Sequence, residues 1–254
     1  MAGRKLLQFE RVGFQYDGRD ILRDLSFDIA AGELLVLLGP SGCGKTTILN
    51  LIAGFLTATS GYAFVDGRVI EAPGPDRGVV FQSAALFDWM NVADNIAFSL
   101  RCAGRPKVEQ RAVAREMAAL VGLAGHEAAF PYQLSGGMRQ RVGLARVLAA
   151  RPKMMLMDEP FAALDVQTRE ALQEEMLRLR DATGCTIVFV THSIEEAVFL
   201  GDRILLLTEA RRGAFREYQV SLPAPRWTPE NRLHGDFLAL RGQVYREMRA
   251  RQAA

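Results

Sequence analysis

The chain has 254 residues, of which 49% are hydrophobic, enough to bury the core of one large domain. Its 31 basic and 29 acidic residues leave a net charge of +2, which gives no electrostatic case for nucleic acid as the main partner. No apolar run approaches the about 18 residues that a membrane-spanning helix needs.

The cysteines and the N-terminal residues favour a reducing, cytosolic compartment. Cys43, Cys102 and Cys185 lie far apart and form no CxxC or Cys/His cluster, which favours free thiols in a reducing cytosol over a zinc site. Residues 1–10 lack the apolar core of a signal peptide. We therefore expect a soluble chain that reaches a membrane only through a partner.

The N-terminal part is expected to contain an antiparallel sheet. Segments with the composition of strands are 6–16, 21–30, 61–65 and 68–70. Asp17-Gly18 and Asp66-Gly67 separate the members of each pair and are turn signals. Tyr16 ends the first strand, where it is either a half-exposed strand aromatic or a ring that stacks on a nucleotide base.

Between these pairs lies a stretch that fits the pattern of a phosphate-binding loop. The apolar run 34–38 before it suits a buried strand, and 47–53 after it suits a helix. Glycines let backbone N–H groups point at phosphate oxygens, and the helix N-terminus adds partial positive charge. The candidate nucleotide-binding residues of this loop are Gly39, Pro40, Ser41, Gly42, Cys43, Gly44, Lys45, Thr46 and Thr47.

A helical block is expected to interrupt the β/α pattern. Residues 78–81 suggest a buried strand that leads to Gln82, which is either a surface amide or a ligand of Mg²⁺ near phosphate. From Asn95 to about Ala150 the pattern is helical, and apolar residues such as Leu120 recur at helical spacing. We interpret this block as an inserted subdomain.

Inside the block, Ser135, Gly136 and Gly137 precede a helix over 139–149. The serine is either a helix N-cap with flexible glycines or part of a second anion site. The chain would then hold two phosphate-binding helix ends but one lysine-bearing loop. That asymmetry becomes meaningful if two copies meet head to tail.

Two carboxylates follow the apolar strand 154–157. Asp158 at the strand end suits the Mg²⁺ side of a phosphate loop, and Glu159 is placed to act as a base on water. A solvated turn is the plainer alternative. Asp165 is a candidate N-cap for a helix over 166–181.

The last part of the chain carries a histidine at a strand end. His192 follows the β-branched strand 186–190, on the edge where parallel sheets bind ligands. Residues 193–196 form a capping box, and 203–207 is the last clear strand. The tail contains exposed arginines, a proline-rich loop and one amphipathic helix with the stripe Phe237, Leu240, Val244 and Met248. We assign it no chemistry.

Together, by kind and order, these motifs resemble the ATPase subunit of an ABC transporter, over roughly residues 6–207. The resemblance implies an α/β fold with a P-loop NTPase core of mainly parallel sheet, formed by 1–82 and 151–210. An N-terminal antiparallel β-subdomain, a helical subdomain at 83–150 and a tail at 211–254 complete one domain. ATP and Mg²⁺ are the implied cofactors.

The family also implies roles for single residues. Tyr16 would stack on adenine, and Asp165 would lie at the dimer seam. Ser135, Gly136 and Gly137 would contact the γ-phosphate held by the opposite subunit. The implied catalytic residues are Lys45, Glu159 and His192, and the implied metal-side residues are Thr46, Gln82 and Asp158.

The residues in and around two of these motifs indicate one branch of the family. Residues 134–146 and 191–201 resemble importers of nitrate, sulfonates and taurine, and Met138 suits this branch. Ala162 and the stretch 87–89 depart from its usual pattern, which leaves the solute open. The implied partners are a second copy of the chain, a membrane permease and, indirectly, a solute-binding protein, with the chain peripheral on the cytoplasmic face of the inner membrane. The alternatives are a soluble ABC ATPase and an unrelated P-loop kinase or switch protein.

Overall fold

The structure, a computed structural model, describes residues 4–209 and 214–252 and divides into two compact units. The first comprises Met1–Gly74 and Arg180–Ala254, and the second comprises Pro75–Leu179. The expected helical subdomain, 83–150, falls inside the second unit, which also contains strands on both sides of it. The expected boundaries of core, subdomain and tail stay predictions.

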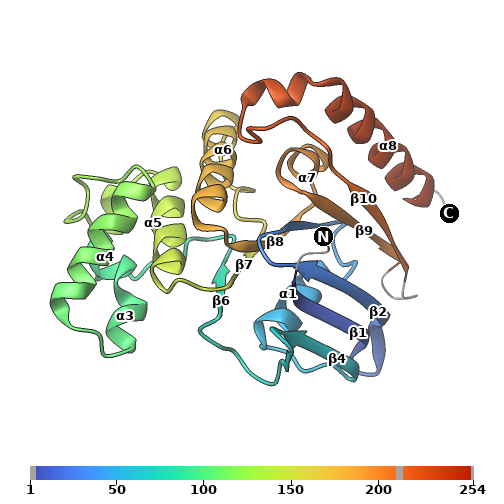
Figure 1. The fold of residues 1–254 in the computed structure, drawn as a ribbon, viewed down its shortest axis with the longest axis horizontal. Helices are drawn as coiled ribbons and strands as arrows, with labels where there is room; N and C mark the ends of the chain where they lie inside the picture. Colours follow the sequence, from blue (N-terminus) through green and yellow to red (C-terminus); the bar gives the residue numbers. More distant parts are fainter. Residues whose placement is uncertain (1–3, 210–213, 253–254) are drawn as a thin grey trace. The chain divides into compact units, whose positions relative to one another are not determined.

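An antiparallel sheet forms the N-terminal part of the first unit (Figure 1). In the order β2-β1-β4-β5, it contains β1 (Lys5–Tyr16), β2 (Arg19–Ala30), β4 (Ser60–Val65) and β5 (Arg68–Val69). The turns have φ values of 48° and 73° at Asp17 and Gly18, and of 52° and 75° at Asp66 and Gly67. Positive φ at both central residues suits the twist of a tight hairpin, so the predicted antiparallel sheet is confirmed.

The strand before the phosphate loop belongs to another sheet. Its strands in this unit, in the order β10-β9-β3-β8, are β3 (Leu34–Leu38), β8 (Thr186–Thr191), β9 (Arg203–Glu209) and β10 (Ala214–Gln219). β3 runs parallel to β8 and β9, and Leu38 pairs with Thr191 and with Leu206. The segments that follow β3 and β8 therefore leave the sheet at the same edge.

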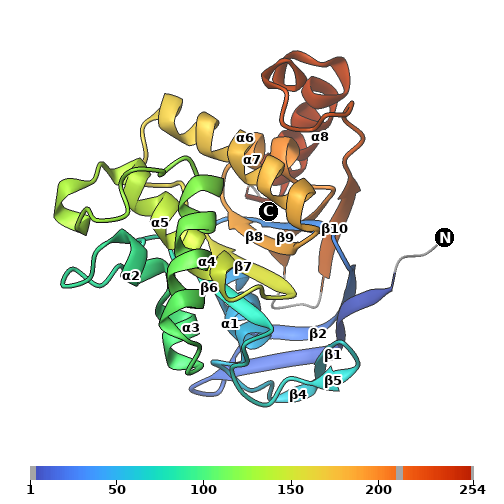
Figure 2. The same ribbon diagram turned by 60° about the vertical axis from the view of Figure 1, so that its left-hand side comes forward.

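Strand β10 contradicts the expectation that the last strand ends near Leu207. It pairs antiparallel with β9 and lies beside it (Figure 2). Arg216 and Glu217 are exposed on it, and Glu217 forms an ion pair with Arg203 at 3.2 Å. Charged edge strands are common because charge discourages pairing with other chains, so exposed charge does not exclude a strand. Arg211 and Arg212, expected as exposed charge, lie outside the described residues.

The C-terminal segment ends in the predicted helix, α8 (Gly235–Gln252), which follows a short 3₁₀ helix (Pro229–Leu233). Phe237 and Val244 are buried, whereas Leu240 and Met248 are half-buried. This is the predicted stripe. Arg241 on α8 forms an ion pair with Glu195 at 3.1 Å.

The second unit combines a parallel strand pair with helices. Its elements are β6 (Arg77–Val80), α2 (Val92–Ile96), α3 (Phe98–Cys102), α4 (Lys107–Leu120), α5 (Gly136–Ala149), β7 (Met154–Asp158) and most of α6 (Val166–Thr183). The helical block starts at Val92, slightly earlier than expected. In α4 the buried stripe is Ala114, Met117 and Ala118, continued by Val121 just beyond the helix, whereas Leu120 is 36% exposed. The sequence pattern had placed Leu120 on the apolar face, which is wrong.

No helix within the described ranges is long and apolar enough to cross a membrane.

Candidate functional site

The loop between β3 and α1 (Lys45–Ala53) is built on glycine. A Cβ added to Gly39 would lie 2.5 Å from the carbonyl oxygen of Leu207 and 2.7 Å from Cys43 Sγ, too close for any side chain. Gly42 and Gly44 have φ values of 78° and 104°, in the region that favours glycine. Gly44 is the N-cap of α1 and supplies no side-chain hydrogen bond. The first turn of α1 is thus a helix end suited to binding an anion.

Lys45 is folded back over this loop. It is 5% exposed, and its Nζ donates to the carbonyl oxygens of Gly39 at 2.7 Å and Pro40 at 2.9 Å. An ammonium group has three donors, so two backbone bonds still allow a contact with phosphate. If the loop binds a nucleotide, the Lys45 ammonium group would lie beside the terminal phosphates.

Cys43 lies in the same loop as a free, half-buried thiol. Burial raises the pKa of its thiol, and the opposing effect of the Lys45 charge is smaller. The thiol therefore stays protonated at neutral pH and is a weak nucleophile. Cys102 and Cys185 likewise form no disulfide with any described residue.

Two threonines follow the lysine on α1. Thr46 is exposed and Thr47 is half-buried. A hydroxyl on the first turn of a helix that binds phosphate is suitably placed to bind a metal ion carried by that phosphate.

His192 is exposed in the short turn between β8 and α7 (Ile194–Leu200). Because Leu38 pairs with Thr191, His192 and the phosphate loop follow neighbouring strands at the same sheet edge. The structure therefore brings the predicted Lys45 loop and His192 together within the first unit. Of the predicted capping box, the half in which Ser193 Oγ accepts from the Glu196 N–H is present at 3.3 Å.

In the second unit, Ser135 is the N-cap of α5, and its Oγ accepts from the N–H of Met138 at 3.2 Å. Ser135 and Gly136 are exposed, whereas Gly137 is buried. A Cβ on Gly137 would lie 2.7 Å from Thr168 Cγ2, so the start of α5 packs against the start of α6. The capping interpretation is confirmed, and the anion site stays a prediction.

Asp165 caps α6, as predicted. Its Oδ1 accepts from the N–H of Thr168 at 3.0 Å, and this bonding lowers the pKa of the Asp165 carboxyl. Thr168 therefore connects two predicted features, since its backbone bonds Asp165 and its methyl group faces Gly137.

The adjacent carboxylates Asp158 and Glu159 lie at the end of β7. Asp158 is the last residue of the strand, and both side chains are half-buried. Glu159 has φ 46°, an uncommon conformation for a residue with a side chain. Its carbonyl accepts from the N–H of Ala162 at 3.2 Å. This bond and the positive φ are also typical of a turn, as at Asp17 and Asp66, so the catalytic role of Glu159 stays a prediction.

Gln82 and Tyr16 are both accessible. Gln82 is exposed just beyond β6, and Tyr16 is 65% exposed at the end of β1. Nothing in their surroundings identifies a ligand, so their roles stay predictions.

Thr46 lies in the first unit, whereas Gln82 and Asp158 lie in the second, so their joint role at Mg²⁺ stays a prediction. Within 4–209 and 214–252, no group of three or more His, Cys, Asp or Glu side chains is arranged to hold a metal ion. Thr46, Gln82 and Asp158 each offer an oxygen, the ligand atom that Mg²⁺ prefers. Phosphate oxygens and waters complete the coordination of Mg²⁺ in most nucleotide sites.

Comparison with known proteins decides the family. Residues 22–162, more than half of the chain, match the family described as "ABC transporter". The chain belongs to this family. The matched region of the ABC ATPase includes the phosphate loop, Ser135–Gly137 and the Asp158–Glu159 pair.

Curated relatives indicate which branch of the ABC family this chain resembles. The ABC ATPase is 49% identical over 203 residues to the taurine import ATP-binding protein TauB of Escherichia coli O157:H7, which covers 80% of each chain. It is 52% identical over 194 residues to TauB of Yersinia pestis bv. Antiqua (strain Antiqua), which covers 76% of each. The prediction of an ABC ATPase subunit of the importer type is confirmed.

Solved structures confirm the fold. CbiO1 of Clostridium perfringens matches with a TM-score of 0.80 and 23% identity over 98% of both chains. The ATP-binding cassette MJ0796, solved as a dimer bound to ADP and Pi, matches with a TM-score of 0.72 and 30% identity. That alignment covers 85% of the present chain and 99% of MJ0796.

Sequence reasoning missed two buried polar residues. Asn95 is fully buried, and its side chain bonds the N–H and the carbonyl of Phe87 and the carbonyl of Met90. Glu196 is 8% exposed and accepts a hydrogen bond from Thr191. For Asn95 the only sequence signal was a polar residue at an apolar position of a helix, which is too common to reveal these bonds. Glu196 was expected as a member of the capping box, but its bond to Thr191 was not.

Proposed function

We propose that this ABC ATPase binds and hydrolyses ATP to energise import of a small solute through a separate membrane permease. Taurine, another sulfonate or nitrate is the proposed class of solute. The observation that carries the proposal is the 49% identity to a taurine import ATP-binding protein over 80% of both chains. The chain would act on the cytoplasmic face of the inner membrane, with a solute-binding protein delivering the solute from the other side.

ATP binding would centre on the phosphate loop. The loop amides and Lys45 would hold the phosphates, because a helix start and an ammonium group both favour negative charge. Thr46, Gln82 and Asp158 would serve Mg²⁺, and Tyr16 would stack on adenine. When bound, Mg²⁺ would neutralise charge that develops on the phosphate oxygens.

Hydrolysis would depend on Glu159 and His192. Glu159 would accept or orient a proton of the attacking water, and His192 would contact the γ-phosphate. The position of Glu159 directly after Asp158, the last residue of β7, and the shared edge of β3 and β8 support these two roles.

Two copies would act head to tail with two ATP molecules between them. Ser135, Gly136 and Gly137 would contact the γ-phosphate bound by the Lys45 loop of the partner copy. Exposure of Ser135 and Gly136 supports this, because a partner's nucleotide can reach them. The dimer of MJ0796 with ADP and Pi is a precedent for a nucleotide-bound pair.

Glu159→Gln tests the catalytic part of the proposal. The amide keeps size and hydrogen bonding but cannot act as a base, so single-turnover hydrolysis should fall by at least about 10²-fold while ATP still binds. Glu116→Gln, an exposed carboxylate on α4, is the matched control and should hydrolyse normally. Hydrolysis by Glu159→Gln at the control rate would assign the chemistry elsewhere.

The segment from Gln82 to Asn95 is the proposed contact with the permease. The alternative was that its apolar side chains pack inside the helical subdomain. Phe87 does so, with its ring 4.5 Å from that of Phe98, whereas Trp89 is 74% exposed. The loop that carries Trp89 is hydrogen-bonded to the side chain of Asn95. An exposed tryptophan on such a loop is suited to binding a partner, because little conformational entropy of the loop is lost on binding.

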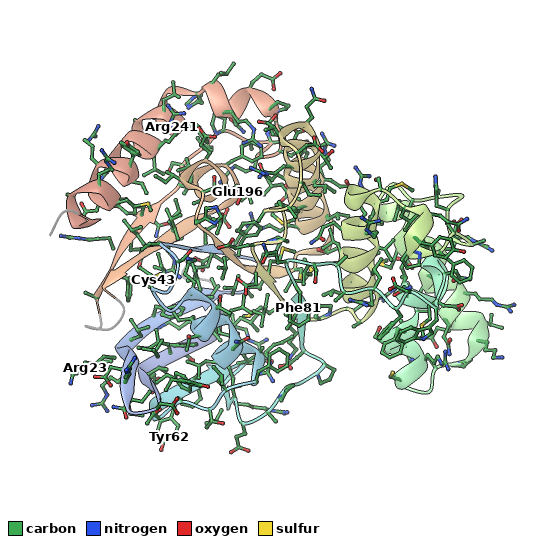
Figure 3. All side chains as sticks on the ribbon, turned by 180° about the vertical axis from the view of Figure 1, so that it is seen from behind. Arg23, Cys43, Tyr62, Phe81, Glu196 and Arg241 are labelled. Atoms are coloured by element: carbon green, nitrogen blue, oxygen red, sulfur yellow. The ribbon has the colours of Figure 1, made fainter. Side chains whose placement is uncertain are left out.

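A photo-crosslinking residue at position 88 would test this contact in the assembled transporter. We expect an adduct with the permease. The same residue at Tyr62, 61% exposed on the antiparallel sheet (Figure 3), should give none. Equal yields from the two positions would remove the segment from the interface. Uptake of taurine, other sulfonates and nitrate by the same transporter in vesicles would identify the solute.

A further inference from the structure

The turn that carries His192 is held at both ends by side chains. β8 ends at Thr191 and α7 begins at Ile194, so only His192 and Ser193 connect them. His192 is exposed, whereas Thr191 is 1% exposed and lies in the core of the first unit. An exposed residue in so short a connection takes its position from its buried neighbours.

Three hydrogen bonds close this turn. The Thr191 hydroxyl donates to Glu196 Oε2 at 2.5 Å and accepts from the N–H of Ser193 at 3.0 Å. Ser193 Oγ accepts from the N–H of Glu196 at 3.3 Å. The Thr191 hydroxyl thus bonds the carboxylate of α7 and the amide that follows His192. Rotation of the Thr191 side chain would break its bond to the N–H of Ser193, the amide that directly follows His192.

Glu196 is an unusual residue for its place. It is 8% exposed, and the residues after it on α7, from Ala197 to Leu200, are fully buried. Figure 3 shows Glu196 within the body of the unit. Its neighbour Glu195 lies in the same helical turn but has a 64% exposed side chain, paired with Arg241. Burying a carboxylate is costly unless it is well bonded, and an apolar side chain would fill the space without that cost.

We propose that Glu196 is a positioning residue for hydrolysis, which acts on His192 through Thr191. By fixing the Thr191 hydroxyl, Glu196 holds the N–H of Ser193 and hence the backbone of His192. Because Thr191 pairs with Leu38, the residue before the phosphate loop, this bond sets His192 relative to that loop. The inference rests on the proposed function, in which His192 contacts the γ-phosphate.

Glu196→Leu and Thr191→Val, in the full-length chain, test the inference. A small misplacement of a catalytic group can cost about 10²-fold in rate, so we expect kcat for ATP to fall about 10- to 100-fold. The KM for ATP should stay within about twofold, because the phosphate loop is unchanged. A variant that merely folds less well would contain less active protein but would show no change in kcat per active molecule. Active-site titration measures the amount of active protein, so kcat can be corrected for any such loss.

Conservative variants separate positioning from packing. Glu196→Gln keeps an acceptor, and Thr191→Ser keeps the hydroxyl, so both should recover most of the lost kcat. Glu195→Leu is the matched control on the exposed side of α7 and should leave kcat unchanged. If Thr191→Val and Glu196→Leu hydrolyse ATP at the control rate, the inference is wrong.

A double-variant cycle with His192→Ala separates this inference from the function on which it rests. If Glu196 acts through His192, Glu196→Leu should cause no further loss of kcat in the His192→Ala background. Full additive losses would contradict the inference and leave the role of His192 intact. Normal hydrolysis by His192→Ala alone would instead contradict the proposed role of His192.

Discussion

Two helices of this protein start in glycine-rich sequence but differ in how their first turns are satisfied. At α1 the N-cap is Gly44, which offers no side-chain oxygen, and Lys45 follows it immediately. At α5 the N-cap is Ser135, whose Oγ already accepts from the N–H of Met138. A ligand at α1 finds an open helix end with a cation, whereas a ligand at α5 finds an end that the chain partly satisfies itself.

The difference suggests a division of labour between the two helix ends. The α1 end can bind phosphate by itself, because backbone donors and a charge act together. The α5 end has a hydroxyl, backbone amides and the guanidinium of Arg139, which bonds the carbonyl of Leu134 at 2.7 Å, but no lysine in its loop. It therefore suits an anion that another site already holds. Affinity should therefore depend on the first end, and assembly on the second.

The largest expected effect comes from removing the cation of α1. Lys45→Met should weaken ATP binding by about 100-fold, because a charge-assisted bond contributes about 1.5–3 kcal/mol and Lys45 would reach two phosphates. Lys107→Met is a matched control, since Lys107 is also the first residue of a helix but is exposed and outside the loop. Titration calorimetry would measure both, and equal affinities would show that the loop needs no lysine.

Ser135→Arg should affect assembly more than binding. The bulky side chain would fill the α5 end, so ATP-dependent dimerisation and turnover should fall by at least about 10-fold, with ATP affinity of the monomer within about twofold. Light scattering and nucleotide titration would measure the two quantities. His126→Arg, at an exposed position of the same unit, is the control. Normal ATP-dependent dimerisation by Ser135→Arg would contradict the shared site.

Gly39→Ala probes how tightly the loop before α1 is built. The new Cβ would lie 2.5 Å from the carbonyl oxygen of Leu207, so we expect a loss of about 1–3 kcal/mol in the free energy of unfolding. Gly235→Ala is the control, because nothing lies within 4 Å of its added Cβ. Urea denaturation of both variants would test whether Gly39 and the carbonyl of Leu207 lie this close. Equal urea midpoints for the two variants would contradict it.

The smallest effect is expected at the cap of α5. Ser135→Ala removes the acceptor for the N–H of Met138 and should cost about 0.5–2 kcal/mol in the free energy of unfolding. Ser135→Asp restores a capping oxygen and should recover most of that loss. If Ser135→Ala unfolded at the urea concentration of the wild type, the cap would contribute nothing measurable.

Local chemistry explains what could be predicted from the sequence. The Asp17-Gly18 and Asp66-Gly67 turns, the buried strand 34–38 and the glycine loop depend on the φ preferences and spacing of adjacent residues. The caps at Ser135 and Asp165 are local for the same reason, since a cap bonds an amide three residues away. The order of these motifs was enough to indicate the family, and the comparison with known proteins confirmed it.

Tertiary structure alone decided which residues lie inside and which strands meet. Leu120 fits the apolar spacing of α4, yet it is 36% exposed because the neighbouring elements pack against Ala114, Met117 and Ala118 instead. Strand β10 exists because β9 offers an edge to pair with, which its own charged sequence does not reveal.

The environment of His192 depends on the same long-range contacts. Only the pairing of β3 with β8 places Leu38 beside Thr191, and with it the phosphate loop beside the histidine turn. The capping box singles out Glu196 from its neighbour Glu195, but the local sequence does not reveal that Glu196 is buried against Thr191 or that Glu195 meets Arg241. Burial and register arise from contacts between residues far apart in the chain, so local propensities do not encode them.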